Sequence, residues 1–319
     1  MSRFGIAGLL GAMVGAAGLS AHAAAADVYP DKPVRLIVPF AAGGTDIVAR
    51  VIGAQLTTRL GRQVVIENRP GVGGTLGMEY VAKADPNGYT LLYTSPSIAI
   101  GPWLFKLNFD PVKALTPISK VATGPIVFTA HPSLPVRSVK DLIVLARRQP
   151  GGLVSASSGT GSFVHLATEL FKQKAGIDFL VVQYKGGSEA QLAVLVGDAQ
   201  LAFNAVTSSL PHIQSGRLRA LAFGGLVKSP ILPGVPTISE SGLAGYEAST
   251  WNGILAPAGT PKPIIDRLHT ELVAVMNMPD VRKALENQGA EVDPLGPAEF
   301  GRFIAAETVK WGAVVRNIK

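Results

Sequence analysis

The sequence predicts an α/β protein of two doubly wound units joined by a two-strand hinge. Apolar runs that are typical of strands alternate with helical spacing through almost the whole chain. The alternation restarts near residue 125, and a strand-like run near residue 250 returns the chain to its first unit. With 319 residues, 47% hydrophobic and only 16% charged, the chain is large enough for two cores and unlike a disordered protein.

The first unit contains three predicted strands and two predicted helices before the restart. The first helix ends at Gly61, a residue type that commonly follows the last helical turn. A strand–helix–strand order places successive strands parallel, because the helix carries the chain back to the same edge. The strands are expected at 34–40, 63–71 and 89–97, and the helices at 45–61 and 73–85.

The second unit repeats this alternation between residues 126 and 225. Ser138 precedes an apolar helical pattern as a typical N-cap, and Gly176 closes the next helix. The Pro- and Gly-rich stretch 227–247 is predicted to be a surface loop. The strands are expected at 126–130, 153–157, 179–184, 199–205 and 218–225, and the helices at 138–149, 161–176, 188–198 and 210–217.

The last part of the chain returns to the first unit. A strand is expected at 249–261, and two helices at 263–277 and 297–319. Residues 27–126 and 250–319 therefore form one predicted domain, and residues 127–249 form a second domain inserted into it. Strand crossings near 125–130 and 248–255 would act as a hinge, which favours a ligand cleft between the domains.

The N-terminus has the three parts of a secretory signal peptide. Arg3 supplies a positive charge, an apolar stretch follows, and AHAAAA offers cleavage sites after Ala23 or Ala26. A membrane anchor is the alternative interpretation. Cleavage after Ala26 removes one of the 29 basic residues and none of the 22 acidic ones, so the net charge falls from +7 to +6. We expect an exported protein, located in a periplasm.

Composition excludes several classes of function. The absence of cysteine rules out disulfides, thiolate catalysis and zinc–thiolate sites. The five histidines stand apart in the sequence, so no metal site is expected, and no acidic pair suggests acid–base catalysis. Basic residues are scattered, so nucleic-acid binding is not expected either. No cofactor is predicted.

At least four predicted strand-to-helix turns carry glycines or hydroxyl side chains. Helix N-termini attract anions, and glycines let a ligand approach the backbone. The carboxyl ends of parallel strands form the ligand-binding edge of such sheets, so these turns are expected to converge. The segments are FAAGGTDIVAR (40–50), ENRPGVGGTLG (67–77), SASSGTGSFVHLATELF (155–171) and VVQYKGGSEAQLAVLVGD (181–198).

Other interpretations of these turns stay open. The first can be a tight connection in which Asp46 caps the helix, without any ligand. Ser162 and His165 are spaced i and i+3 and could touch, which is the pattern of a secreted serine hydrolase, although no G-x-S-x-G motif is present. A packed histidine on an apolar helix face is the structural alternative for His165.

Long ordered motifs also resemble one family. YPDKPVRLIVPFAAGG, VVIENRPGVGG, SASSGTGSFVHLATELFK and VVQYKGGSEAQLAVLVG are similar to those of the tripartite tricarboxylate transporter receptors, or Bug proteins, and the similarity covers about residues 28–319. The resemblance implies a type II periplasmic-binding-protein-like fold and a receptor rather than an enzyme. It implies a monomer that closes on a small organic carboxylate and delivers it to a membrane permease. A ligand-sensing role in signalling is the alternative within this class.

The resemblance also implies which residues bind the ligand. In this family backbone N–H groups, hydroxyls and water hold the carboxylate. Two positions depart from the family pattern: Gly44 and Asp46 are one residue closer together, and Asn204 stands where Asp is common. The implied ligand-binding residues are Phe40, Ala42, Gly43, Gly44, Asp46, Gly73, Gly74, Thr94, Ser157, Ser158, Gly159, Ser162, His165, Tyr184, Lys185, Gly186 and Asn204.

Overall fold

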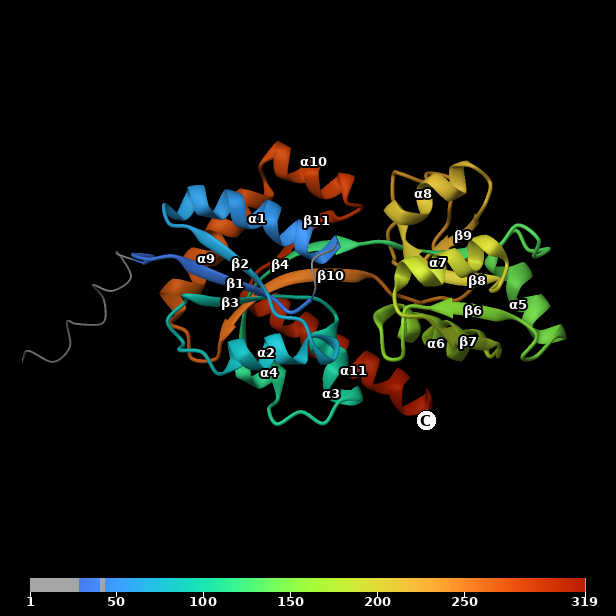
Figure 1. Cartoon of the computed structure of the whole chain (residues 1–319), viewed down its shortest axis with the longest axis horizontal. Coiled ribbons are helices and arrows are strands. Elements are labelled where there is room, and N and C mark those ends of the chain that lie inside the picture. Colours follow the sequence, from blue (N-terminus) through green and yellow to red (C-terminus); the bar gives the residue numbers. More distant parts are fainter. Residues whose placement is uncertain (1–28, 41–43, 319) are drawn as a thin grey trace, which may run out of the picture.

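The computed structural model describes residues 29–40 and 44–318, which form two units with one β-sheet each (Figure 1). The first sheet has the strand order β11-β4-β10-β3-β1-β2, and the second has the order β7-β6-β8-β5-β9. The strands are β1 Val34–Val38, β2 Val64–Asn68, β3 Thr90–Thr94, β4 Leu115–Gly124, β5 Ile126–Ala130, β6 Val154–Ser157, β7 Leu180–Gln183, β8 Leu201–Ala205, β9 Arg219–Phe223, β10 Thr250–Pro257 and β11 Glu291–Leu295.

Helices cover both sheets, and each predicted helix is present, although the helix expected at 210–217 begins four residues earlier, at Val206, and ends at Gln214. The predicted caps are confirmed: the Ser138 side chain accepts a hydrogen bond from Asp141 N, and Gly176 closes its helix at φ 59°. The helices are α1 Gly44–Leu60, α2 Thr75–Ala82, α3 Ser97–Leu104, α4 Pro111–Ala114, α5 Val139–Arg148, α6 Phe163–Ala175, α7 Gly187–Val196, α8 Val206–Gln214, α9 Lys262–Met276, α10 Pro279–Asn287 and α11 Pro297–Ile318, with a 3-10 turn at Val72–Gly74.

The predicted doubly wound architecture is confirmed, although both sheets are mixed rather than purely parallel. Strand β1 runs parallel to β2 and β3, and β6 runs parallel to β7 and β8. Strand β10 is antiparallel to β3 and β4, and β5 is antiparallel to β8 and β9. Strands β10 and β5 lie beside the two crossings between the sheets, whereas β11, which is antiparallel to β4, lies between α10 and α11.

Several elements had no clear signal in the sequence. Strand β4 contains Pro117 and the buried Lys120, which make the segment look like a loop, but Lys120 pairs with Asp293 of β11. The stretch 227–247 forms no helix or strand, yet Ile238 and Tyr246 within it are fully buried. Tyr246 donates a hydrogen bond to Ala167 O at 2.9 Å, so this loop covers the second core.

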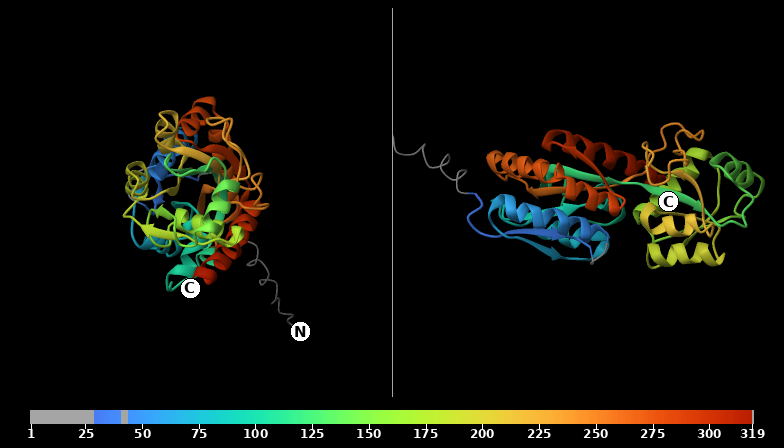
Figure 2. Two further views of the ribbon diagram at one scale, coloured as in Figure 1. Left: turned by 90° about the vertical axis from the view of Figure 1, so that its right-hand side faces the viewer. Right: turned by 90° about the horizontal axis from the view of Figure 1, so that it is seen from above.

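The C-terminal helix α11 connects the two units in addition to the crossing strands. Phe300 and Ile304 in its first half pack into the core of the first sheet. Trp311 and Val314 in its second half pack into the core of the second sheet. Figure 1 shows the two units side by side along the long axis, with β4 and β10 in the first unit on the side that faces the second, and the right-hand view of Figure 2 shows the same arrangement from above. The units therefore meet along two strands and one helix.

Candidate ligand-binding site

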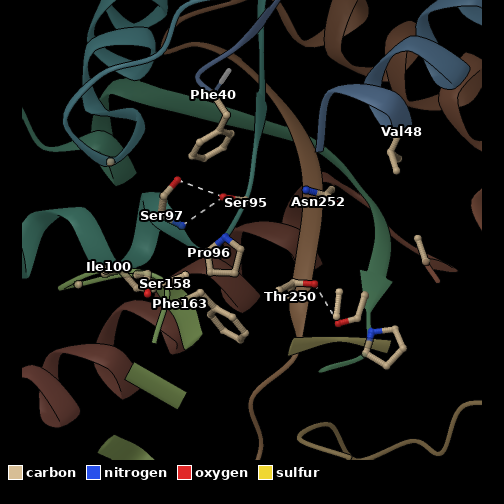
Figure 3. A pocket seen from close by; sticks show the side chains of 18 of the residues that line it. Phe40, Val48, Ser95, Pro96, Ser97, Ile100, Ser158, Phe163, Thr250 and Asn252 are labelled. Atoms are coloured by element: carbon tan, nitrogen blue, oxygen red, sulfur yellow. Dashed lines mark hydrogen bonds between the residues drawn. The ribbon is translucent and has the colours of Figure 1, made fainter. Parts of the chain in front are cut away.

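A cavity of about 600 Å³ lies between the two units, next to the carboxyl ends of β1, β3, β6 and β8. This is the edge where the sequence predicts that the turns converge. Figure 3 shows the labelled side chains surrounding one space. The wall consists of Phe40, Val48, Gly73, Ser95, Pro96, Ser97, Ile100, Gly101, Phe105, Gly124, Pro125, Ser158 to Phe163, Ala205, Val206, Thr207, Thr250, Asn252, Gln288, Gly289 and Ala290.

The first unit supplies a hydroxyl-rich turn to the cavity. Ser95 follows β3, and its Oγ lies 3.2 Å from the Oγ of Ser97, which begins α3. Asn252 on β10 donates its side-chain amide to Thr94 O at 3.4 Å. These contacts hold the part of the cavity wall that the first unit supplies.

The second unit supplies the turn before α6. Ser162 Oγ accepts a hydrogen bond from His165 N at 3.2 Å, and Gly161 N donates to His165 Nδ1 at 3.1 Å. Gly161 has φ +75°, and a Cβ there would lie 2.5 Å from Leu104 Cδ1 of α3. The positive φ favours glycine at this position, and a larger residue would also require the Leu104 side chain to shift. His165 holds the turn in place through its contacts with Gly161 and Ser162.

The described wall contains no charged side chain but has several helix N-termini beside it. Among the wall residues in the described part of the chain, none is Asp, Glu, Lys or Arg. Three helices, α3, α6 and α8, begin at this wall, and helix N-termini carry partial positive charge. The rings of Phe40, Phe105 and Phe163 add apolar surface. This combination suits a small anion that has an apolar body.

Asp46 lies behind the wall and not on it. The carboxylate is buried and accepts hydrogen bonds from Arg50 Nε at 2.8 Å and from Asn68 Nδ2 at 2.9 Å. The bond from Arg50 holds the pKa of Asp46 below its usual value. Asn68 Nδ2 also donates to Phe40 O at 3.0 Å, so Asp46 helps to position the start of the wall.

The structure brings only some of the implied ligand-binding residues to the cavity. Phe40, Gly73, Ser158, Gly159 and Ser162 line it. Ala42 and Gly43 lie outside the described residues, and of Gly44 only the backbone that begins α1 is described. The others are not among the wall residues: Asp46, Gly74, Thr94, Ser157, His165, Tyr184, Lys185, Gly186 and Asn204.

The residues that do not reach the cavity lie close behind it or on the surface. Thr94, Ser157 and Asn204 are buried at strand ends, one residue before a wall residue. The exposed Lys185 directs its backbone N–H to Glu189 Oε2 at 3.2 Å. The turn between β7 and α7 thus contributes no residue to this wall.

Sequence reasoning missed several wall residues. The segment TSPS after β3 places Ser95 and Ser97 on either side of a proline, which is the same turn signal that identified the other segments. Thr250 and Asn252 lie where the second crossing enters the first sheet, a position that only the topology reveals. Gln288 lies between α10 and β11, neither of which the sequence predicted.

The geometry of Ser162 and His165 differs from that of a hydrolase pair. Ser162 Oγ contacts the backbone N–H of His165 rather than its ring, and His165 Nδ1 accepts from Gly161. In a serine hydrolase the base instead takes the proton from the serine hydroxyl. Both side chains here hold the turn that lines the cavity.

The burial of His165 predicts a pH-dependent stability. Burial lowers the pKa of His165 below its ordinary value of 6.5, so the unfolded chain takes up a proton before the folded chain does. We therefore expect the stability from neutral His165 to be present above about pH 6.5 and to decline as the pH falls toward the lower folded pKa. Melting temperatures from pH 7.5 to 5 should fall more for the wild type than for His165→Gln. Equal slopes would contradict this role.

Two α/β units around a neutral, hydroxyl-rich cleft at a hinge define a bilobal solute receptor. The profile of the tripartite tricarboxylate transporter family receptor matches residues 48–319. The protein belongs to this family, which confirms the resemblance seen in the sequence. The family consists of substrate-binding receptors and not of enzymes.

Curated relatives and solved structures support this assignment over nearly full length. Protein BugT of Bordetella pertussis is 36% identical over 313 residues, which cover 97% of this chain and 96% of that protein. The structure of R. palustris Rpa4515 with adipate has 35% identity and a TM-score of 0.78, and covers 90% and 97% of the two chains. The structure of MatC from Rhodopseudomonas palustris with bound malate has 29% identity and a TM-score of 0.74, and covers 90% and 100%.

Proposed function

We propose that this protein is a periplasmic receptor that captures a small organic carboxylate in the cleft and delivers it to a membrane permease of the tripartite tricarboxylate type. In this proposal residues 27–126 with 250–319, and residues 127–249, close on the ligand as two domains. The observation that carries the proposal is the described cleft wall, which contains no charged side chain but receives three helix N-termini.

The ligand class rests on the chemistry of this wall. The hydroxyls of Ser95, Ser158 and Thr207 and the amide of Asn252 can donate hydrogen bonds to a carboxylate. The wall side chains described here provide no carboxylate for a ligand ammonium group. The apolar rings suit an aliphatic or aromatic carbon body. Adipate and malate in the structures of two relatives belong to the same chemical class.

The cellular role rests on the sequence and on family membership. Residues 1–26 have the pattern of a cleaved export signal, which supports a periplasmic location. No helix in the described part of the chain is long and apolar enough to cross a membrane. Residues 29–40 and 44–318 contain no cluster of three acidic or histidine side chains that could hold a metal ion.

We propose that the receptor acts as a monomer.

Mass spectrometry of small molecules released from natively purified protein tests the proposal. We expect a single carboxylate, present in amounts approaching one per chain and absent from a Ser158→Asp variant. A released compound without a carboxylate, retained by both proteins, would overturn the proposed ligand class. Binding of the ligand-loaded protein to membranes that contain the permease subunits, compared with membranes that lack them, tests the delivery step.

A further inference from the structure

All three tryptophans of the chain contact α11 within one short segment. Trp103 from α3 donates its indole N–H to Thr308 O at 2.9 Å. Trp251 from β10 and Trp311 from α11 both donate to Glu307 Oε2, at 3.1 and 2.9 Å. This segment therefore brings together a helix and a strand of the first unit and the helix that joins the two units.

Glu307 is a buried carboxylate whose two oxygens are both engaged. Its side chain is only 6% exposed. One oxygen accepts the two indole N–H groups, and the other pairs with Lys310 Nζ. Lys310 also pairs with Glu247, in the segment that leads into β10. A buried charge is costly unless it is paired and hydrogen-bonded. The groups that pair with or donate to Glu307 lie on β10 and α11, the elements that join the two units.

The two tryptophans held by Glu307 lead directly to opposite walls of the cleft. Trp251 lies between Thr250 and Asn252, which line the cavity where β10 enters the first sheet. The Trp311 ring packs edge-on against Phe163, with centroids 5.4 Å apart, and Phe163 is a wall residue from the second unit. A continuous chain of packed side chains thus joins the two walls through one carboxylate oxygen.

We propose that Glu307 is a positioning residue that sets the angle between the two walls of the ligand cleft. By accepting from Trp251 and Trp311 with the same oxygen, it fixes β10 relative to the half of α11 that packs into the second core. This role in orienting the two units does not depend on the proposed function. The effect of Glu307 on ligand affinity rests on the proposed function as well.

A distance measurement between the units tests this role without any ligand. The chain has no cysteine, so Ser188→Cys on α7 and Lys283→Cys on α10 provide two exposed, specific spin-label sites. We expect a narrow distance distribution by double electron–electron resonance in this parent. Glu307→Gln keeps a carbonyl oxygen for both indoles and should retain that distribution. Glu307→Leu removes the acceptor and should broaden or shift it.

Trp251→Phe provides a second, milder variant in case Glu307→Leu fails to fold. It keeps an aromatic ring but removes one of the two donors, so it should also broaden the distribution. The circular dichroism of each variant establishes that both units remain folded. Distributions equal to the parent in folded Glu307→Leu or in folded Trp251→Phe would overturn the proposal.

Adipate titration adds the functional consequence. If the parent binds adipate, Glu307→Leu should weaken binding at least tenfold, and Glu307→Gln should stay within about threefold. Equal affinities of all three proteins would contradict the coupling to the cleft. If the parent binds no carboxylate at all, the proposed function fails, whereas the distance distributions still decide the role of Glu307.

Discussion

Replacing Ser158 with Asp is expected to weaken carboxylate binding at least a hundredfold. Ser158 follows β6 and lines the cavity in the turn before α6. A carboxylate at this position would face the bound anion in a wall that has no cationic side chain among its described residues. Like charges brought together at a binding surface cost several kcal/mol. A hundredfold loss corresponds to about 2.8 kcal/mol.

The matched control is Ser158→Asn, which has nearly the same size as Asp and no charge. We expect its affinity to stay within about tenfold of the wild type, since its amide can still donate to a carboxylate. Isothermal titration calorimetry of the three proteins, with similar melting temperatures as evidence of folding, makes the comparison. An unchanged affinity of Ser158→Asp would place the ligand outside this cavity.

Replacing Gly253 with Ala is expected to destabilise the fold by about 2–3 kcal/mol, as for overpacking of a core. Gly253 lies in β10, next to the wall residue Asn252 and at a shift in the register with β4. A Cβ there would lie 2.2 Å from Phe300 Cζ and 3.0 Å from Ser119 O. The ring of Phe300 is fully buried, and the Ser119 oxygen belongs to the backbone, so neither yields easily.

Gly301→Ala in α11 is the matched control for this substitution. A Cβ at Gly301 would meet only Pro117, at an ordinary 3.6 Å, and alanine favours the helix by roughly 1 kcal/mol. Urea unfolding should therefore show Gly253→Ala well below the wild type and Gly301→Ala equal to it or above. Adding Phe300→Leu to Gly253→Ala should recover part of the loss. A Gly253→Ala variant as stable as the wild type would contradict the packing described here.

Much of the fold follows from local sequence patterns. Helix α6, predicted over 161–176, ends at Gly176 as predicted, because its helical spacing and its closing glycine agree. Strand β4 could not be predicted, because Lys120 in its centre is stabilised by Asp293, 173 positions later in the chain. Strand β11 in turn depends on its pairing with β4. Both strands are therefore determined by contacts between distant parts of the chain and not by a local sequence pattern.

The site was only partly predictable for the same reason. Turn chemistry identified Ser158 and Gly159, because a strand followed by small residues and a helix is a local pattern. It could not show that Ser158 lines the cavity whereas Ser157 does not. Successive side chains of a strand point to opposite faces, and the Ser157 side chain is buried. Thr250 and Asn252 reach the cavity only because the chain crosses between the sheets beside them. The path of the chain between the sheets, and not a local sequence motif, places these two residues in the cavity wall.

Thermal melting of the mature chain with a panel of carboxylates tests the central claim most directly. Adipate, malate and benzoate sample two chain lengths and an aromatic body, and the matching amides, which carry no charge, serve as controls. At a hundredfold excess over Kd, a ligand that binds only the folded chain adds about 2.7 kcal/mol of stability. The account predicts saturable stabilisation by at least one carboxylate, absent with its amide and in Ser158→Asp. Stabilisation by the amides alone, or by none of these compounds, would contradict it.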